Sequence, residues 1–430
     1  MNRIIVKLKV ALLNLIVRCV DDLRESGSRI SKRLYVCINR IISIVIKASS
    51  YQVLNHSSYL EKYHNGGSTS LFVKREGYSS NLVYNDSTEE QRLIPCPLSD
   101  IELYHYKDLI ISGDSDIIID TKRNIAINDL CCNKDERIIY YDSVKLAQKK
   151  NTILLRYLRV ESEIASGIVL SGLFSNNYYH SIYDNMLRIV AIQESSVPAD
   201  VPYLIDRATY EISSLRTVFQ CLTQERNRSF VILEKGRAYR VGDLYYVSHV
   251  NYMIPSIKSY DLCKPTDTVF DLNLTLKMRE QLLSIKSDKT FPEKFFISRK
   301  HTSRRNFNED EVFSVLQKEG FERVFPEDLT FEEQIALFNN AKIIVGGGGA
   351  AMTNLMFCNK GCKVLIINKT MDQVPCFTTV PYAIGVKIRH YGQENKDKRL
   401  HSDYVVNPQE VYKYLKILLS DDRDCNYPQI

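Results

Sequence analysis

Residues 295–310, FFISRKHTSRRNFNED, and residues 324–354, VFPEDLTFEEQIALFNNAKIIVGGGGAAMTN, combine a strand, a basic loop, two helical patterns and a glycine loop. The strand is the apolar run at residues 295–297. The loop after it is rich in positive charge, with Arg299, Lys300, His301, Arg304 and Arg305. A buried core holds such charge only when anions pair with it. The sequence therefore predicts an anionic ligand at the end of this strand.

A second predicted strand, residues 342–345, leads into a glycine-rich loop and then a helix. The loop consists of Gly346, Gly347, Gly348, Gly349, Ala350 and Ala351. Backbone N–H groups that glycines expose at a helix N-terminus bind phosphate through unsatisfied donors and the helix dipole. A tight turn without a ligand is the alternative for the glycines taken alone. The basic loop on the neighbouring unit favours the anion site.

The glycine loop also matches the dinucleotide pattern G-x-G-x-x-A, at Gly346, Gly348 and Ala351. In dinucleotide-binding folds, an acidic residue at the end of the next strand binds the ribose. The next strand here, residues 363–367, ends at Asn368 instead. A nucleotide-dependent oxidoreductase is therefore disfavoured.

Another chemical segment lies upstream, at residues 176–194. Its apolar residues form one helical face: Tyr179, Ile182, Tyr183, Met186 and Val190. His180 and Asp184 are four residues apart, so they project from the same side of the helix. A carboxylate fixes the tautomer of an imidazole and raises its basicity, or the imidazole tunes the carboxylate, and either suits a general base. From spacing alone, a capped helix whose histidine hydrogen-bonds its neighbour is the alternative.

Together these blocks resemble glycosyltransferase family 61. Downstream the resemblance is carried by Ser298-Arg299, Arg304-Arg305, Asn308-Glu309, Pro326-Glu327, Glu333-Gln334 and the run from Gly346 to Asn354. Upstream, Asn177-Tyr178-Tyr179-His180 with Asp184 and Arg188 is similar to the family's N-Y-Y-H-W…D…P-R segment. The blocks keep the family's order and spacing between residues 165 and 390. Two positions depart from the family: Gly348 replaces the histidine of its G-P-H-G-A loop, and Ser181 replaces its tryptophan.

The resemblance implies an inverting, metal-independent glycosyltransferase that needs no cofactor beyond its substrate, a nucleotide sugar of the UDP-sugar type. It implies a GT-B architecture, an α/β fold in which two Rossmann-like halves face each other across a cleft. With the family segment in place, His180 or Asp184 becomes the catalytic base. The acceptor side then includes Asn177, Tyr179 and Arg188. The donor would be bound by Ser298, Arg299, Arg304, Arg305, Glu327, Gly346, Gly347, Gly348, Gly349, Ala350, Thr353 and Asn354.

Composition and charge fit a two-domain globular protein. The chain has 430 residues, of which 44% are hydrophobic and 25% charged. Its net charge of +6 is concentrated at the N-terminus, because residues 1–50 contain ten Lys or Arg against three acidic residues. The remainder is close to neutral, which argues against a nucleic-acid partner. Eleven scattered cysteines without C-x-x-C pairs indicate neither a disulfide framework nor a zinc site, so we expect a reducing, cytoplasmic environment.

The first 50 residues predict a basic, helical extension. Its longest apolar run is shorter than the ~20 residues that cross a bilayer, and no signal-type cleavage site follows. One amphipathic stripe contains Ile4, Leu8, Leu12, Leu15 and Cys19, and a second contains Leu34, Ile38, Ile41 and Val45. Basic amphipathic helices bind anionic membrane surfaces, here through residues 1–48 at the inner face of the plasma membrane. A helical hairpin packed on the catalytic domain or a partner is an equal alternative.

The remaining sequence predicts the domain organisation. Residues 51–94 are interpreted as a connecting region with little regular structure, because Ser, Asn, Tyr and Gly are frequent there. Short apolar runs at residues 109–111, 117–119 and 125–127 predict a β-meander, with Asp114-Ser115-Asp116 as a turn rather than a metal-binding D-x-D motif. Strands and helices alternate at residues 200–285 and again after residue 295, which predicts parallel sheets. The predicted domains are residues 95–288 on the acceptor side, residues 289–404 for the nucleotide sugar, and a helix at residues 405–430 that packs back on the first half.

These inferences predict a glycosyltransferase that moves a sugar to a glycan or lipid-linked glycan hydroxyl in surface polysaccharide biosynthesis. In this interpretation Glu327 holds the ribose or base of the nucleotide. Because Gly348 departs from the family loop, a non-catalytic glycan- or nucleotide-binding scaffold descended from such enzymes is the alternative.

Overall fold

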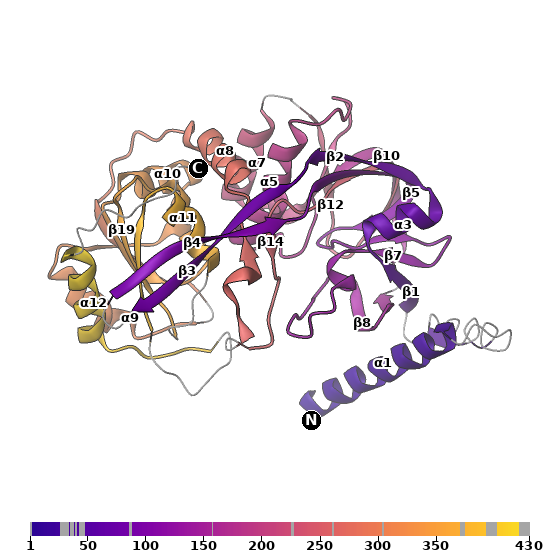
Figure 1. Ribbon diagram of the computed structural model, residues 1–430, viewed down its shortest axis with the longest axis horizontal. Coiled ribbons are helices and arrows are strands. Elements are labelled where there is room, and N and C mark those ends of the chain that lie inside the picture. Colours follow the sequence, from indigo (N-terminus) through magenta and orange to yellow (C-terminus); the bar gives the residue numbers. More distant parts are fainter. Residues whose placement is uncertain are drawn as a thin grey trace.

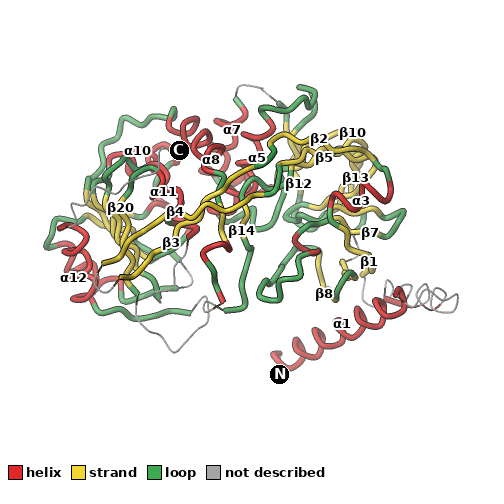
Figure 2. Tube along the Cα trace, in the orientation of Figure 1, coloured by secondary structure: helices red, strands yellow, loops and turns green. Residues whose placement is uncertain are grey.

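The structure is a computed structural model of the chain. It describes residues 2–25, 34, 38, 41–42, 48–85, 88–156, 158–224, 228–259, 262–302, 305–369, 375–392 and 402–420. The protein is a mixed α/β fold with two main sheets, one of five strands from the C-terminal half and one of eleven strands from the N-terminal half (Figures 1 and 2).

The C-terminal sheet is entirely parallel. Its strands are β16 (Lys294–Ile297), β17 (Glu322–Val324), β18 (Ile343–Gly347), β19 (Lys363–Ile367) and β20 (Lys387–Tyr391). The spatial order β17-β16-β18-β19-β20 places the first and third of these strands side by side. From β16 the chain adds β17 on one side and then β18, β19 and β20 on the other, so the order of strand addition reverses between β16 and β18. Ligands bind outside the carboxyl ends of strands at such a switch point. The predicted Rossmann-like sheet is present, and the basic loop and the glycine loop both begin at its switch point.

The N-terminal sheet is mixed. Its parallel part is β12 (Phe230–Leu233), β11 (Tyr203–Asp206), β10 (Val160–Val169) and β13 (Ala238–Val247), as the alternation of strands and helices predicts. β13 then pairs antiparallel with β5 (Ile101–Ser112). The predicted meander is confirmed, because β5, β6 (Ile118–Asp120) and β7 (Ile125–Ile127) pair antiparallel in order. The sheet is completed by β1 (Ala48–Leu54), β2 (Gly66–Phe72), β8 (Lys145–Lys149) and β9 (Thr152–Arg156).

Most helices flank or connect these two sheets. They are α3 (His56–Tyr63), α4 (Tyr178–His180), the π-helical η2 (Ser181–Met186), α5 (Leu187–Ile192), α6 (Arg207–Glu211), α7 (Ser213–Thr223), α8 (Leu272–Leu283), α9 (Glu309–Gln317), α10 (Phe331–Asn340), α11 (Thr379–Ala383), and the short 3₁₀ helices η1 (Leu130–Cys132), η4 (Pro265–Asp267), η5 (Pro326–Asp328), η6 (Ala350–Phe357) and η7 (Pro375–Phe377).

One hydrophobic core joins the two halves. It contains Ile168 of β10, Leu187 of α5, Met278 of α8 and Ile344 of β18, all fully shielded from solvent. Figure 1 shows α5, α7 and α8 between the two sheets. Burial of apolar surface therefore stabilises the two halves together rather than each sheet alone.

The prediction of little regular structure at residues 51–94 is wrong. After β1, α3 and β2, β3 (Arg75–Asn85) and β4 (Thr88–Leu98) pair along their whole length as a hairpin. The hairpin crosses from the N-terminal half to α11 of the C-terminal half (Figure 1). At its base, Arg75 Nη2 donates to Asp271 Oδ2 at 2.7 Å in a buried ion pair. Its polar, turn-rich composition concealed the strands, because a two-stranded ribbon is ordered by pairing and by the surface that it contacts.

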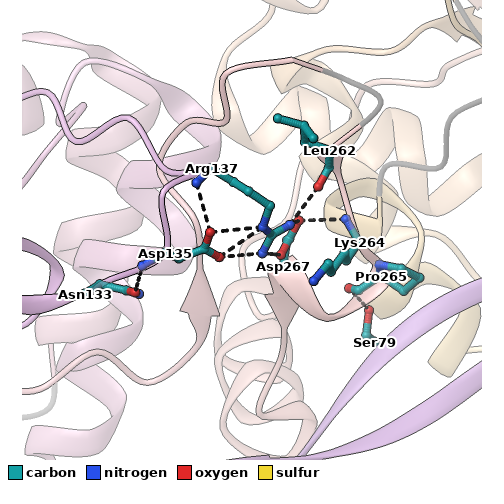
Figure 3. Close-up of polar contacts among 8 residues, drawn as sticks. All are labelled: Ser79, Asn133, Asp135, Arg137, Leu262, Lys264, Pro265 and Asp267. Carbon is teal, nitrogen blue, oxygen red and sulfur yellow. Dashed lines mark hydrogen bonds and ion pairs between the residues drawn. The ribbon is translucent and has the colours of Figure 1, made fainter.

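The connection between the halves is held by Arg137 (Figure 3). Its Nη1 and Nη2 donate to the two carboxylate oxygens of Asp267 at 2.9 and 2.8 Å, and Nη2 also donates to Asp135 at 2.6 Å. Nearby, the Ser79 hydroxyl of β3 donates to the carbonyl of Pro265 at 2.5 Å. The segment between β14 (Tyr252–Met253) and β15 (Thr268–Val269) is thus fixed both to the first half and to the hairpin.

Helix α12 (Pro408–Ser420) forms near its predicted position, but it does not pack back on the first half. Val411, Leu415 and Leu418 share a hydrophobic cluster with Phe296 of β16 and Leu365 of β19. α12 therefore covers the face of the C-terminal sheet opposite the central core. Its amphipathic pattern predicts a buried face, whereas the surface that buries this face depends on the topology of the sheet.

Helix α1 (Asn2–Glu25) packs on β8 and β9. Leu13, Val17 and Val20 are buried there, and Asp21 accepts a hydrogen bond from the Thr152 hydroxyl at 2.6 Å. As one of the two alternatives for this segment predicted, α1 packs on the rest of the protein. Within the described part of the chain, no helix combines the length and apolar character needed to span a bilayer.

Of the stripe predicted for α1, the three residues Leu12, Leu15 and Cys19 lie on the open side of the helix. Leu12 and Leu15 are 56% and 58% exposed, and Cys19 is also exposed. The second predicted stripe falls mostly outside the described residues, although Leu34 and Ile41 are described and exposed. α1 thus has two apolar stripes, one buried by the sheet and one facing outward.

His56 of α3 is a buried core histidine. It is 1% exposed, and its ring stacks between Tyr104 and Tyr246 with centroid distances of 4.7 and 4.5 Å. Its Nδ1 shares a hydrogen bond of 2.6 Å with the Tyr106 hydroxyl. Burial lowers the pKa of His56 to about 4, because the imidazolium form loses its hydration.

His56→Gln should make the free energy of unfolding fall less steeply as the pH is lowered from 7.5 to 5. In the unfolded chain the pKa of His56 is 6.5, and in the folded chain it is about 4. The stability that neutral His56 contributes to the fold is therefore fully present above pH 6.5 and is lost as the pH falls towards 4. At pH 5 the loss is about 2 kcal/mol for this one group. Denaturant unfolding from pH 7.5 to 5 measures it, with His64→Gln at an exposed site as the control. Parallel pH slopes for the wild type and the His56 variant would contradict the assignment.

Candidate active site

Arg299 lies across the glycine loop at the switch point. It follows β16, is 8% exposed, and donates from Nη1 to the carbonyl of Gly348 at 3.2 Å. A Cβ atom on Gly347 would lie 2.7 Å from Arg299 Cδ, and one on Gly349 would lie 1.9 Å from Nη1. Glycine at positions 347 and 349 therefore permits the close approach of this side chain, which a larger residue would displace. The basic loop and the glycine loop are therefore packed against each other through Arg299.

Glu309 holds Ser298 and the backbone of Arg299 in place. Its Oε1 accepts from the Ser298 hydroxyl at 2.5 Å, and its Oε2 accepts from the backbone N–H of Arg299 at 2.7 Å. Glu309 is the first residue of α9 and is 6% exposed. A carboxylate at a helix N-terminus is stabilised by the helix dipole. Glu309 of the family pattern thus orients Ser298 and Arg299, whereas its neighbour Asn308 bonds to the backbone of Val406.

Fewer backbone donors are available in the glycine loop than the sequence suggests. Gly346 and Gly347 belong to β18, and the N–H of Gly348 donates to the carbonyl of Ile367 at 3.0 Å. This corrects the expectation that residues 347–350 all offer their N–H groups. The first intrahelical bond of η6 runs from Met352 N–H to Gly349 O, so the N–H groups of Ala350 and Ala351 precede it. An anion at this edge would meet the amides that begin at Gly349.

Arg305 and Glu327 flank the switch point, whereas Arg304 lies outside the described residues. Arg305 has a φ of 56°, and its Nε is buried without a hydrogen-bond partner among the described residues. Burial raises the pKa of the Cys376 thiol to about 12, and the charge of Arg305 opposes this shift, which places the guanidinium beside η7. Glu327 follows β17 and lies 3.4 Å from His301 Nδ1, whose ring stacks on Phe325 at 4.8 Å.

Two predicted donor residues are buried, and one of them, Asn354, hydrogen-bonds within the fold. Thr353 and Asn354 are 2% and 0% exposed in η6, so neither can reach a ligand in this conformation. The Tyr178 hydroxyl donates to Asn354 Oδ1 at 2.5 Å, and Asn354 Nδ2 donates to Gln334 Oε1 at 2.8 Å. This chain of hydrogen bonds joins the helix that bears His180 to the helix that follows the glycine loop.

His180 and Asp184 form the predicted pair. His180 Nδ1 lies 2.7 Å from Asp184 Oδ2, and their side chains are 17% and 18% exposed. The pair spans the junction between α4 and the π-helical η2, and π-helical turns are frequent at functional sites. The same segment buries Ile182 and Tyr183 in the central core. The helix is therefore held rigidly while its polar pair remains accessible.

The predicted acceptor-side residues differ in accessibility. Asn177 caps the helix, accepting a hydrogen bond from Tyr179 N–H at 3.0 Å. Tyr179 is buried against Phe377 of η7 at a centroid distance of 5.5 Å, and its hydroxyl donates to Met253 Sδ at 3.1 Å. Arg188 lies in the predicted acceptor-side half but is 0% exposed, so its side chain is shielded from solvent in this conformation. Its Nη2 donates to Asn185 Oδ1 at 3.0 Å and to a backbone carbonyl.

A cavity of about 500 Å³ adjoins the His180–Asp184 pair in the N-terminal half. Asp184, Asn185, Phe174 and His249 contribute to its wall, as does Asp116 of the D-x-D turn. The turn itself lies between β5 and β6, as predicted. Sequence reasoning missed this cavity, because its walls come from eight separate stretches of the first 255 residues.

These features define a Rossmann-like α/β protein with a candidate anion site at the switch point and a polar His–Asp pair on an adjoining helix. Residues 178–365 match the family model described as Glycosyltransferase 61. This match confirms the resemblance that the motifs of these residues indicate.

A curated relative extends the comparison. The EGF domain-specific O-linked N-acetylglucosamine transferase of Drosophila melanogaster is 31% identical over 104 residues, which cover 23% of this chain. The alignment covers 20% of that relative's length, about a fifth of it. The match therefore concerns a segment rather than the whole of either protein.

Proposed function

We propose that the protein is a nucleotide-sugar-dependent glycosyltransferase of GT-B type that inverts the anomeric configuration without a metal ion. The observation that carries the proposal is the contact between α4 and η6, with its Tyr178–Asn354–Gln334 hydrogen bonds. This contact brings a candidate base and a candidate diphosphate site, from sequence segments about 170 residues apart, into one structure. If each segment only stabilised its own half of the protein, the two segments would not need to be in contact.

In the proposed reaction His180 is the base and Asp184 positions it. With a proton on Nδ1, His180 donates to Asp184 across 2.7 Å, and the lone pair of Nε2 accepts the proton of an acceptor hydroxyl. The acceptor oxygen attacks the anomeric carbon as the bond between this carbon and the diphosphate oxygen breaks. A single displacement of this kind inverts the configuration.

The departing diphosphate carries the negative charge that develops in the reaction. Arg299, Arg305 and the amides that begin at Gly349 are the groups proposed to stabilise it, in place of a metal ion. Glu327, at the end of the neighbouring strand β17, is proposed to bind the nucleoside. A UDP-sugar is the proposed donor, and an N-acetylglucosamine donor belongs in any panel because the Drosophila relative is named for this sugar.

Arg305→Ala should weaken binding of a nucleoside diphosphate by about 10- to 100-fold and leave binding of the bare nucleoside nearly unchanged. The reason is that charge-assisted contacts to phosphate are worth ~1.5 to 3 kcal/mol each. Calorimetric titration with UDP and uridine measures both affinities. Lys300→Ala is the matched control, because Lys300 pairs with Asp310 at 2.8 Å. Equal weakening of both ligands would show that Arg305 is structural.

A second candidate function, a non-catalytic scaffold, is favoured by Gly348 at the position of the family histidine. The glycine does not have a left-handed backbone, so a side chain is not excluded by conformation. A Cβ atom would lie 2.5 Å from Asn368 Oδ1, and Asn368 Nδ2 hydrogen-bonds His390 Nδ1 at 2.9 Å. The loop is thus packed for glycine.

Gly348→His should lower donor affinity by roughly tenfold if the loop is adapted to glycine, because the new side chain displaces Asn368. Transfer assays and nucleotide titrations on both forms measure it, with Gly67→His as a control at a position with open space. Higher turnover in the variant would indicate a decayed site that the histidine repairs. If neither form transfers sugar or binds any nucleotide, the scaffold function replaces the enzyme.

The location and acceptor remain part of the proposal. A lipid-linked glycan at the inner face of the plasma membrane suits the basic N-terminus, and α1 offers the outward stripe of Leu12 and Leu15 beside Arg18. The buried stripe of the same helix shows why deleting residues 1–48 is a poor test, since it also removes Val17 and Val20 from the core.

A Leu12→Gln, Leu15→Gln double variant should lose most of its sedimentation with vesicles that contain phosphatidylglycerol, because the apolar contact with the interface is removed. Its unfolding midpoint should not change, since both side chains are exposed. Val405→Gln, at a 71% exposed position of the C-terminal half, is the control. Unchanged sedimentation of the double variant would exclude this face of α1 as the membrane contact.

A further inference from the structure

The cavity beside Asp184 has an acidic lining. Of the described residues that line it, five are carboxylates: Asp100, Glu102, Asp116, Asp129 and Asp184. Arg75 is the single Arg or Lys among them, and its guanidinium is neutralised by the buried ion pair with Asp271. Burial lowers the pKa of His249 to about 4, so this histidine is uncharged at neutral pH. The buried Arg188 behind the wall offsets part of this charge, because it acts on Asp116. The five carboxylates still outnumber Arg75 and Arg188, so an anion in the cavity would be opposed by a net negative charge.

The deep part of the cavity wall holds unsatisfied polar atoms. Asp116 is 4% exposed, and its Oδ1 has no hydrogen-bond partner among the described residues, while Oδ2 accepts from Leu173 N–H at 3.3 Å. Behind the wall, Nε and Nη1 of the fully buried Arg188 are also without partners. Buried polar atoms are rarely left without a partner, so an unpaired carboxylate oxygen at a cavity wall indicates a ligand or a bound water.

A glycine lets these atoms pack closely together. A Cβ atom on Gly172 would lie 2.7 Å from Asp116 Oδ1 and 2.4 Å from Asn185 Oδ1, so a larger residue would displace both side chains. The two oxygens therefore lie close together beside Gly172, and both residues contribute to the cavity wall. Asn185 is held in place by the hydrogen bond from Arg188 Nη2. Acceptors that converge in this way suit the O–H groups of a sugar, because each hydroxyl donates one hydrogen bond and accepts others.

We propose that this cavity is the acceptor subsite and that it takes a glycan end without negative charge, whose hydroxyl groups donate to Asp116 and Asn185. The proposal rests on the proposed transferase function, because Asp184 of the same wall positions the base. The volume of about 500 Å³ is within the range of small-molecule sites. Uronic acids and phosphorylated sugars are excluded by the carboxylates, so the enzyme extends a neutral sugar residue.

The test measures acceptor binding without any donor. Saturation-transfer NMR and calorimetric titration on the full chain would compare methyl glucoside, galactoside and mannoside with the matching methyl uronides, and UDP would be titrated separately. At least one neutral glycoside should bind at least tenfold more tightly than its uronide. Asp116→Asn keeps the shape of the side chain but removes its charge and replaces one carboxylate oxygen by an NH2 group. It should weaken binding of that glycoside about tenfold and leave UDP affinity unchanged.

A second variant keeps the proposal testable if Asp116→Asn does not fold. Asp100→Asn with Glu102→Gln changes only the charge at the cavity rim, and it should raise uronide affinity severalfold without altering glycoside affinity. Asp403→Asn, far along the chain in the C-terminal half, is the control for net charge. Equal or tighter binding of uronides to the wild type would overturn the proposal.

The two proposals fail in different ways. Neutral glycosides that bind through Asp116, with no transfer from any donor, would reject the transferase and support the cavity as a glycan site. Transfer to neutral acceptors with the same KM in the wild type and Asp116→Asn would support the transferase and reject this cavity as the acceptor subsite.

Discussion

The hydrogen bond from Tyr178 to Asn354 is the constraint on which the proposed site depends. Both residues are enclosed by the core that joins the halves, and Asn354 completes its bonding through Gln334. A buried amide with one partner removed is costly, because the remaining polar atoms have no water to replace it. The three side chains therefore specify one relative position of α4, η6 and α10. The distance between the candidate base and the glycine loop is fixed as a consequence.

A second constraint operates within the C-terminal half, between Arg299 and the glycine loop. Glu309 orients the backbone of Arg299, and the guanidinium then lies on Gly348 and excludes side chains at positions 347 and 349. The positive charge is thus prepositioned at the edge of the sheet where doubly wound folds bind ligands. Preorganised charge is effective because no reorganisation accompanies the reaction.

The sequence predicted those features that are encoded locally. Parallel strands around residues 295 and 345, the meander and the His180–Asp184 pair follow from periodicity and spacing, and the structure contains them. Features that depend on distant partners were not predictable. The β3–β4 hairpin is ordered by its contact with α11, α12 packs on its own sheet, and Arg188 is buried beneath Asn185. Motif residues such as Thr353 and Asn354 were assigned to the ligand because sequence patterns do not distinguish a residue that touches a substrate from one that holds the fold.

The acidic cavity could not be predicted from the sequence, although some of its residues, such as Asp116 and Asp184, belong to motifs that the sequence reveals. Asp116 belongs to a D-x-D triplet that is sufficiently explained as a hairpin turn, and nothing in its neighbours along the chain indicates a ligand. Its significance comes from Gly172 and Asn185, which are more than 50 residues away in sequence and lie beside its Oδ1, a buried oxygen without a hydrogen-bond partner among the described residues. A turn residue can therefore have a structural role through its backbone and one carboxylate oxygen, while the second oxygen is available to a substrate. The basic side chains lie at the switch point of the C-terminal sheet, whereas the acidic cavity lies in the N-terminal half. In the proposed reaction the first would bind the diphosphate and the second the uncharged glycan. That division of charge would keep the anionic donor and the acceptor in separate subsites on either side of His180.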